Sequence, residues 1–330
     1  MSCYKLKSIN IPTGITTIEG SVFRNCTALT TVNLPEGITS IGNDAFHSCT
    51  KLTSIIIPNT VETVGESAFD ECRDLNSVKM STALKGLGKD AFRNCSSLTS
   101  IEFPNTLTYF FGYNPGGIFY GCSKLESVIL SDNIKTIPNG MFYGCSSLSS
   151  ISIPDKIEKI EGMAFYNSGL KSIVLPDGVT EIGIHAFSGC KYLKTVTLGR
   201  NMSSIGPCAF SGCNELSDFY CHAGKIINIG ELSSNKDDWS WYVFYGSYIE
   251  YATLHVPESL VSSYQETVPW CYFGTIVGIP KEDTGIAVNT KNESTIIGRY
   301  SIDGQHLSSN SKGIIIIKMS DGSTKKVLLK

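Results

Sequence analysis

Apolar residues return along most of the chain in one fixed order. A segment of the form Leu-x-x-Ile-x-Ile-Pro is followed by a second apolar pair and then by Gly-x-x-Ala-Phe-x-x-Cys. Counted on the phenylalanine, successive copies lie 22 or 23 residues apart, except for one interval of 27. The aligned residues are Phe23, Phe46, Phe69, Phe92, Phe119, Phe142, Phe165, Phe187 and Phe210. A fixed period in this range predicts a solenoid, because one unit cannot bury its apolar side without its neighbours.

Each unit can be divided into three short elements. In the segment LTTVNLP, Val32 and Leu34 alternate with polar residues, which is the period of a strand. The proline that follows ends this strand because it has no N–H to donate. The segment ITSIG supplies a second apolar pair, with Gly42 available for a turn. The segment NDAFHSC predicts one helical turn capped by Asn43 or Asp44.

This pattern resembles the BspA-like class of leucine-rich repeats over about residues 3–278. The resemblance implies an α+β repeat solenoid, rich in β-structure, with the right-handed superhelix of leucine-rich repeats in turns of ~23 residues. It also implies an exported bacterial protein, secreted or on the outer cell surface. The implied partner is a host extracellular-matrix or cell-surface protein or glycan, without catalysis and without a cofactor.

The periodicity also predicts the domain boundaries. Residues 1–278 are expected to form the solenoid, including a degenerate C-terminal cap at about 217–278. Proline and charge break the pattern at 279–285, which predicts a linker. Residues 286–330 contain apolar runs separated by DG, SKG and DGS turns, which predict a small all-β module. This tail resembles the C-terminal sorting-type domains of exported proteins in the same bacterial group.

Charge and hydropathy exclude several classes of partner. Charged residues make up 17% of the chain, the net charge is −3, and no dense Lys/Arg block occurs. Nucleic acids and anionic membranes are therefore not expected as partners. The longest apolar runs fall far short of the ~20 residues that a transmembrane helix needs. Met1 leads directly into the repeat, so an export signal is expected outside these residues.

The cysteines follow the repeat. Nine of the twelve occupy one position of the unit: Cys3, Cys26, Cys49, Cys72, Cys95, Cys122, Cys145, Cys190 and Cys213. Such a column indicates buried free thiols, because a free cysteine behaves as a small hydrophobe and pairing would strain a regular stack. No Cys-x-x-Cys occurs, so no metal site is expected. Whether Cys208, Cys221 or Cys271 form a disulfide remains open at this point.

The sequence contains no convincing catalytic motif. One apparent motif arises from the repeat itself, and the others are absent. The segment GLGKDA matches a dinucleotide-binding fingerprint, but Gly88 and Ala91 belong to the repeat and Gly86 is interpreted as a chance glycine. The five histidines are scattered, and none forms a set with a nucleophile and a carboxylate. We therefore do not expect an enzyme.

Binding candidates lie at the outward positions of the first strand. The residue before the central apolar one is always a hydroxyl residue: Ser8, Thr31, Ser54, Ser77, Ser100, Ser127, Ser150, Ser172 and Thr195. The next outward position varies along the chain and includes Lys79 and Glu102. We take Ser54, Ser77, Lys79, Ser100, Glu102 and Ser127 as ligand-binding candidates. Hydroxyl residues also suit a pleated surface and bond across strands, so a purely structural role stays open.

Two aromatic segments supply further candidates. The long interval contains Tyr109, Phe110, Phe111 and Tyr113, and insertions in repeat arrays form surface loops, often on a binding face. Some of these rings are expected to fill the core of their turn. Trp239 and Trp241 lie in a second aromatic run within the last, degenerate turns, where sealing of the solenoid is the alternative role.

Two functions remain open from sequence. The first is a non-catalytic, adhesin-like binding protein that uses the sheet face and the aromatic segments. The second is a structural rod or spacer at the cell envelope with no specific ligand. Exposed aromatic rings would favour binding, whereas buried rings and a uniformly polar sheet face would favour the spacer.

Overall fold

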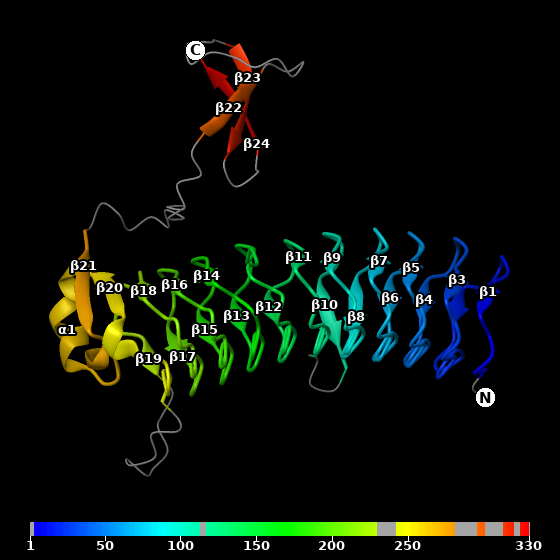
Figure 1. Cartoon of the computed structure of the whole chain (residues 1–330), viewed down its shortest axis with the longest axis horizontal. Coiled ribbons are helices and arrows are strands. Elements are labelled where there is room, and N and C mark those ends of the chain that lie inside the picture. Colours follow the sequence, from blue (N-terminus) through cyan, green and yellow to red (C-terminus); the bar gives the residue numbers. More distant parts are fainter. Residues whose placement is uncertain are drawn as a thin grey trace. The chain divides into compact units, whose positions relative to one another are not determined.

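The computed structural model describes residues 3–112, 117–229 and 242–280, together with three strands at 296–300, 313–319 and 324–329. The chain divides into two units, Met1–Thr284 and Gly285–Lys330. The first unit is a solenoid whose turns stack along one axis, so that each strand lies beside its equivalent in the next turn (Figure 1). The predicted leucine-rich-repeat fold is confirmed.

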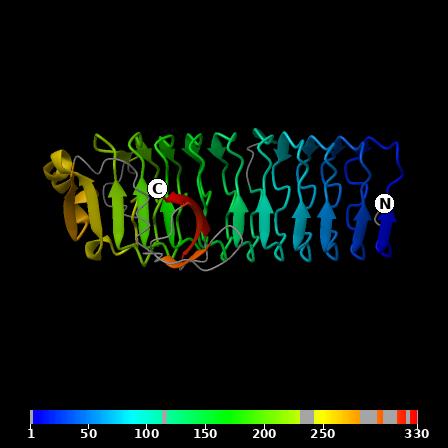
Figure 2. The same cartoon turned by 90° about the horizontal axis from the view of Figure 1, so that it is seen from above.

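The first strands of the turns lie in one row, seen face-on in Figure 2, which is divided into four parallel sheets; residues 150–152, between β11 and β14, form no strand. The row comprises β1 (Ser8–Asn10), β3 (Thr31–Asn33), β5 (Ser54–Ile56), β7 (Ser77–Lys79), β9 (Ser100–Glu102), β11 (Ser127–Ile129), β14 (Ser172–Val174), β16 (Thr195–Leu198), β18 (Asp218–Cys221), β20 (Thr253–Pro257) and β21 (Thr275–Ile279). The paired strands keep the repeat in register, so that Ser54 lies opposite Ser77 and Ser100 opposite Ser127. Outward residues of the same repeat position therefore form columns.

A second row runs along another side of the solenoid. It comprises β2 (Thr17–Ile18), β4 (Ser40–Ile41), β6 (Thr63–Val64), β8 (Gly86–Gly88), β10 (Tyr109–Phe111), β12 (Thr136–Ile137), β13 (Lys159–Ile160), β15 (Glu181–Ile182), β17 (Ser204–Ile205) and β19 (Asn228–Ile229). This row is divided into two five-stranded sheets, one ending at β10 and the other beginning at β12. The division falls at the 27-residue interval.

The third side of each turn is not helical, so the expectation of a helical turn capped by Asn43 or Asp44 is wrong. Asp44 adopts a left-handed conformation with φ of 56°. Its N–H donates to the carbonyl of Glu66 at 2.8 Å, and the N–H of Phe46 donates to the carbonyl of Ala68 at 2.8 Å. Alternate backbone donors are thus satisfied by the next turn, while those between them bond within the turn, as the N–H of His47 does to the carbonyl of Asp44 at 3.0 Å.

The core is a stack of identical side chains. Neighbouring phenylalanine rings of the column lie 5.1 to 5.8 Å apart between centroids. The cysteine column packs beside it, and the Cys49 thiol donates to the carbonyl of Phe23 at 3.1 Å. Burial raises the pKa of Cys49 to about 12, which keeps the thiol protonated.

None of the twelve cysteines, all within the described residues, forms a disulfide. This includes Cys208, Cys221 and Cys271, for which the sequence had left a pair open. The predicted buried free thiols are confirmed for the column, except that Cys3 in the first turn is exposed.

The C-terminal end of the first unit closes the stack. Strands β20 and β21 extend the first row beyond the point where the sequence pattern decays. The 3-10 turn η2 (Ile249–Tyr251) precedes β20. The 3-10 turn η3 (Glu258–Leu260), the helix α1 (Val261–Glu266) and the 3-10 turn η4 (Trp270–Tyr272) lie between β20 and β21. Tyr264 and Trp270 are fully buried, and Trp270 packs against Phe219 and Phe244. These rings shield the last turn from water.

The second unit contains β22 (Ile296–Tyr300), β23 (Gly313–Met319) and β24 (Thr324–Leu329). The three strands form an antiparallel sheet in the order β22-β23-β24. Among the helices that the structure describes in either unit, none has the length and apolar character of a membrane span.

Candidate functional site

The hydroxyl column lies on the outer face of the first strand row. Ser54, Ser77, Ser100 and Ser127 sit at equivalent positions of β5, β7, β9 and β11, and all four are exposed. Within the described residues, none of these four hydroxyls hydrogen-bonds to another protein group, so they do not bond across the strands. Their hydrogen-bonding capacity is open to solvent or to a partner.

The neighbouring outward column is chemically mixed. Ile56 and Ile129 are 65% and 54% exposed, which is unusual for isoleucine, and the exposed Lys79 and Glu102 lie between them. At the ~4.8 Å spacing of strands, these four positions span about 14 Å. We call the following residues the central sheet face: Ser54, Ile56, Ser77, Lys79, Ser100, Glu102, Ser127 and Ile129.

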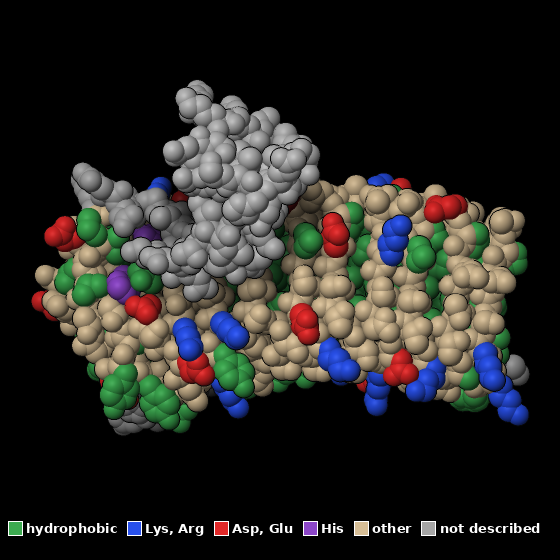
Figure 3. Space-filling view, turned by 45° about the horizontal axis from the view of Figure 1, so that its top comes forward, with side chains coloured by type: hydrophobic (Ala, Val, Ile, Leu, Met, Phe, Trp, Pro, Cys, Tyr) green, Lys and Arg blue, Asp and Glu red, His purple; other side chains and the backbone are tan. Residues whose placement is uncertain are grey.

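The charged side chains of the central sheet face differ in their ion pairing from many charged side chains elsewhere on the solenoid. Lys79 and Glu102 form no ion pair with any described residue. On other sides of the solenoid, lysines and carboxylates of adjacent turns pair at 2.9 Å: Lys51 with Asp74, Lys85 with Glu62, and Lys135 with Glu158. Figure 3 shows this face as mostly uncharged polar surface with isolated charged and apolar side chains. The two unpaired charges are therefore free to meet charges on a partner.

The far end of the same face carries a group that the sequence reasoning missed. His255 on β20 lies with its Nε2 atom 3.0 Å from an Asp218 carboxylate oxygen on β18. The ring of Tyr220 stacks on His255, with centroids 4.0 Å apart. The register places Tyr220 opposite Thr197, so a count along the outward column would have reached it. The repeat motif decays before Tyr220, so the sequence pattern alone did not extend the outward column beyond Thr197.

The aromatic candidates lie on a different side of the molecule. Tyr109, Phe110 and Phe111 form β10, which pairs with β8 in the second row, rather than a projecting loop. Tyr109 is 46% exposed, and the two phenylalanines are half-buried. The first- and second-row candidates therefore do not form one site (Figures 1 and 2). Tyr113, Trp239 and Trp241 lie outside the described residues.

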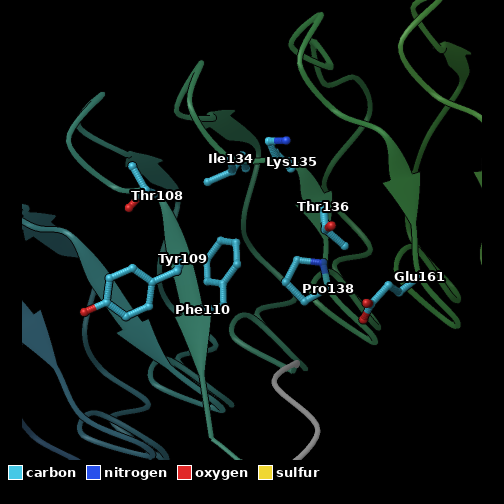
Figure 4. Close-up of a pocket in the computed structure, with 8 residues that line it drawn as sticks. All are labelled: Thr108, Tyr109, Phe110, Ile134, Lys135, Thr136, Pro138 and Glu161. Carbon is cyan, nitrogen blue, oxygen red and sulfur yellow. The ribbon is translucent and has the colours of Figure 1, made fainter.

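A pocket of about 230 Å³ opens beside β10. The side chain of Phe110 faces Pro138 across it, and Lys135, Thr136 and Glu161 line its other side (Figure 4). Its walls therefore combine an aromatic ring and a proline with hydroxyl, amino and carboxylate groups. The sequence pointed to the aromatic residues but not to their partners from the next two turns.

A ladder of tyrosines is the second feature that the sequence reasoning missed. Tyr120, Tyr143 and Tyr166 follow the column phenylalanine in three consecutive copies. Their rings stack at centroid distances of 4.3 and 4.6 Å. Because the ring faces cover one another, the stack shields them from solvent. The repeated Phe-Tyr pair was the signal that could have revealed the ladder.

The same side of the solenoid carries a buried carboxylate. An oxygen of Asp70 lies 3.6 Å from His47 Nδ1 and 3.5 Å from a guanidinium nitrogen of Arg93. Burial raises the pKa of Asp70 to about 6, and the charge of Arg93 opposes this shift. Burial also lowers the pKa of His47. In the described part of the chain, no group of three or more His, Cys, Asp or Glu side chains is placed to hold a metal ion.

Comparison with known proteins identifies the repeat. A family model described as "BspA type Leucine rich repeat region" matches, in six copies, residues 1–114 and 115–233. No curated protein matches the sequence.

Several solved structures are similar to this chain. A leucine-rich repeat protein from Bacteroides ovatus is 23% identical, with 83% of this chain and 92% of that chain covered and a TM-score of 0.47. The leucine-rich repeat protein of T. pallidum is 28% identical, with 57% and 78% covered and a TM-score of 0.46. A leucine-rich cell surface protein from Faecalibacterium prausnitzii is 24% identical, with 74% and 64% covered and a TM-score of 0.39.

Proposed function

This chain belongs to the BspA-type leucine-rich repeat family, and we propose that it is a non-catalytic, adhesin-like binding protein whose contact surface is the central sheet face. Solenoids of stacked repeats offer extended surfaces that suit macromolecular partners. The proposed partner is a host extracellular-matrix or cell-surface protein or glycan, and the proposed location is secreted or on the outer cell surface.

One observation carries the proposal: the central sheet face leaves its polar groups without partners. The hydroxyls of Ser77 and Ser100 and the charges of Lys79 and Glu102 interact with no described group. Exposed isoleucines flank them at either end of the face. A spacer would need only a solvated surface, and unpaired charges beside exposed apolar side chains add nothing to its stability.

A protein partner fits this mixture better than a glycan does. Ile56 and Ile129 are two apolar contact points about 14 Å apart, and Lys79 and Glu102 between them present both signs of charge. Protein interfaces combine buried apolar anchors with complementary charges in this way. The central sheet face has no aromatic ring on which a sugar could stack.

The test is a binding screen of the purified chain on an array of extracellular-matrix proteins and glycans. The variants Lys79→Glu and Glu102→Lys run beside the wild type. The matched control is Lys124→Glu, at an exposed lysine outside the central sheet face, in the turn before β11. We expect a specific protein hit that both face variants weaken at least fivefold and the control retains. The spacer would become the better account if no array member bound above background.

A further inference from the structure

In the second strand row, β10 and β12 are not joined by the backbone hydrogen bonds that join its other neighbouring strands, and we call this interruption the opening. At the other junctions of this row, an N–H of one turn donates to a carbonyl of the preceding turn, in most cases at the equivalent position. Examples are the N–H of Thr108 to the carbonyl of Lys85 at 3.0 Å and that of Glu158 to the carbonyl of Lys135 at 2.7 Å. Between Thr108 and Lys135, both described, this bond is missing. Among the described residues, the carbonyl of Thr108 and the N–H of Lys135 therefore have no hydrogen-bond partner.

A second backbone hydrogen bond is missing because a proline occupies the position of its donor. Elsewhere, the residue after the second strand donates to the preceding turn, as Gly65 does to Ile41 and Gly183 to Ile160, each at 2.7 Å. Pro138 occupies this position after β12, and proline has no N–H. The carbonyl of Phe110 therefore also has no partner among the residues that the structure describes. Proline within sheets is confined to edge strands, which agrees with β12 starting a new sheet.

The two unpaired carbonyls have the spacing of a strand edge. Thr108 and Phe110 are two residues apart, so both carbonyls point toward the same neighbour, the direction in which the next strand would lie. Both residues line the pocket beside β10, and so do Lys135 and Pro138 on the opposite wall. The side chain of Phe110 faces into this space (Figure 4). The equivalent residues Ile18, Ile41, Val64 and Leu87 are buried, whereas Phe110 is half-exposed.

We propose that this opening binds an extended peptide segment, which adds to β10 as a strand by donating the N–H groups of two alternate residues to the carbonyls of Thr108 and Phe110 and places one apolar side chain between Phe110 and Pro138. Strand addition at an exposed sheet edge is an established mode of peptide recognition, with backbone bonds supplying affinity and side-chain pockets supplying specificity. The cavity volume of about 230 Å³ suits a single large side chain.

A peptide fits the opening better than a saccharide does. The unpaired groups of β10 are backbone carbonyls at strand spacing, which match peptide N–H groups in register. Stacking on a sugar would require a free aromatic face, but the ring of Tyr109 lies over Gly86 and the ring of Phe110 is half-buried. The opening lies on a different side of the solenoid from the central sheet face. Peptide binding here can therefore be correct or wrong independently of the proposed function.

The probe is a synthetic pool of N-acetylated, C-amidated hexapeptides with Leu, Ile, Phe or Tyr fixed at the third position, read by fluorescence anisotropy on the full chain. We expect binders in the pool. The best of them, resynthesised with N-methyl groups at the donating amides, is expected to bind about tenfold more weakly, because each removed N–H loses one hydrogen bond.

Two variants locate the site. Pro138→Gly restores the N–H that other turns donate, which pairs the carbonyl of Phe110 and is expected to weaken binding about tenfold. Thr136→Phe fills the pocket, with Thr63→Phe at the equivalent position of β6 as the matched control, and melting temperatures check that each variant folds. Binding that survives both site variants, or a pool without binders, overturns the proposal. A glycan-array hit that Thr136→Phe abolishes, with no peptide bound, would assign the opening to a saccharide instead.

Discussion

The ring of Tyr109 lies directly over Gly86, its partner in the neighbouring strand of the second row. A Cβ atom at Gly86 would come within 2.5 Å of two carbon atoms of the tyrosine ring. The interpretation of Gly86 as a chance glycine is therefore wrong: this turn has no side chain there because the tyrosine of the next turn occupies the space. The pairing holds β10 against β8 while its other edge faces the pocket.

Gly86→Ala is expected to displace the Tyr109 ring and to lower the free energy of unfolding by about 1–3 kcal/mol, as overpacking does. Chemical denaturation measures the loss. Gly224→Ala is the control, because a Cβ at Gly224 meets no atom within 4 Å. Equal stability of Gly86→Ala and wild type would contradict the packing described for Tyr109.

Asp70 is expected to make stability depend on pH. Its pKa is raised from 3.8 in the unfolded chain to about 6 in the folded protein, so the folded state binds its proton more tightly. The stability from this group is fully present below about pH 4 and is lost as the pH rises through 6. Relative to wild type, Asp70→Asn should therefore gain stability between pH 4 and pH 7.5, by at most about 3 kcal/mol.

Thermal and urea unfolding at several pH values would measure this difference between Asp70→Asn and wild type. Both proteins carry His47→Gln as a background, because His47 Nδ1 lies 3.6 Å from the Asp70 carboxylate and its own titration would not cancel from the difference. Asp74→Asn, which removes a more exposed carboxylate paired with Lys51, serves as the control. A difference that did not change with pH would show that Asp70 is already ionised in the folded protein at pH 4.

The thiols are expected to differ sharply in reactivity. The column thiols from Cys26 onward are buried and burial raises their pKa, as for Cys49 and Cys72, so they should not react with a thiol reagent in the folded protein. Cys3 is exposed and Cys271 partly exposed, so these two should react first. All twelve should react in denaturant without reductant. A lower total would reveal a disulfide and contradict the packing of the column.

The tyrosine ladder is expected to stabilise its three turns. Tyr143 is stacked on both sides, so Tyr143→Ala should lower the free energy of unfolding by about 1–3 kcal/mol from lost burial and ring contacts. Tyr143→Phe keeps the stack and should cost much less. Tyr192→Ala, at a tyrosine that is 54% exposed, is the surface control. Equal effects of Tyr143→Ala and Tyr192→Ala would show that the stack adds no stability.

The repeat made the solenoid predictable, because its period of 23 residues fixes which side chains stack. The same period could not show how the third side of each turn is built. Asp44 suggested a helix cap, but hydrogen bonds to the following turn decide that backbone, and these are contacts between residues distant in sequence. Gly42 looked suited to a turn, yet it is required because a Cβ there would lie 2.6 Å from the backbone of Gly20.

The candidate site was predictable only where the repeat stays regular. Ser54, Ser77, Ser100 and Ser127 could be placed on one face by counting alone, and the structure puts them side by side. The opening beside β10 could not be found in this way, because it depends on two absences: the missing N–H of Pro138 and a missing bond between Thr108 and Lys135. Both become visible only once the neighbouring turns are placed next to each other.

The central claim, that the central sheet face is the contact surface, is tested most directly by blocking it with one bulky side chain. Ser100→Arg places a long, charged group in the middle of the face without touching the core, and Ser123→Arg does the same at an exposed serine outside the central sheet face, in the turn before β11. Affinity for the protein found in the array screen would be measured for both. We predict that Ser100→Arg lowers affinity at least tenfold and that Ser123→Arg leaves it unchanged. Full affinity in Ser100→Arg would place the contact surface elsewhere.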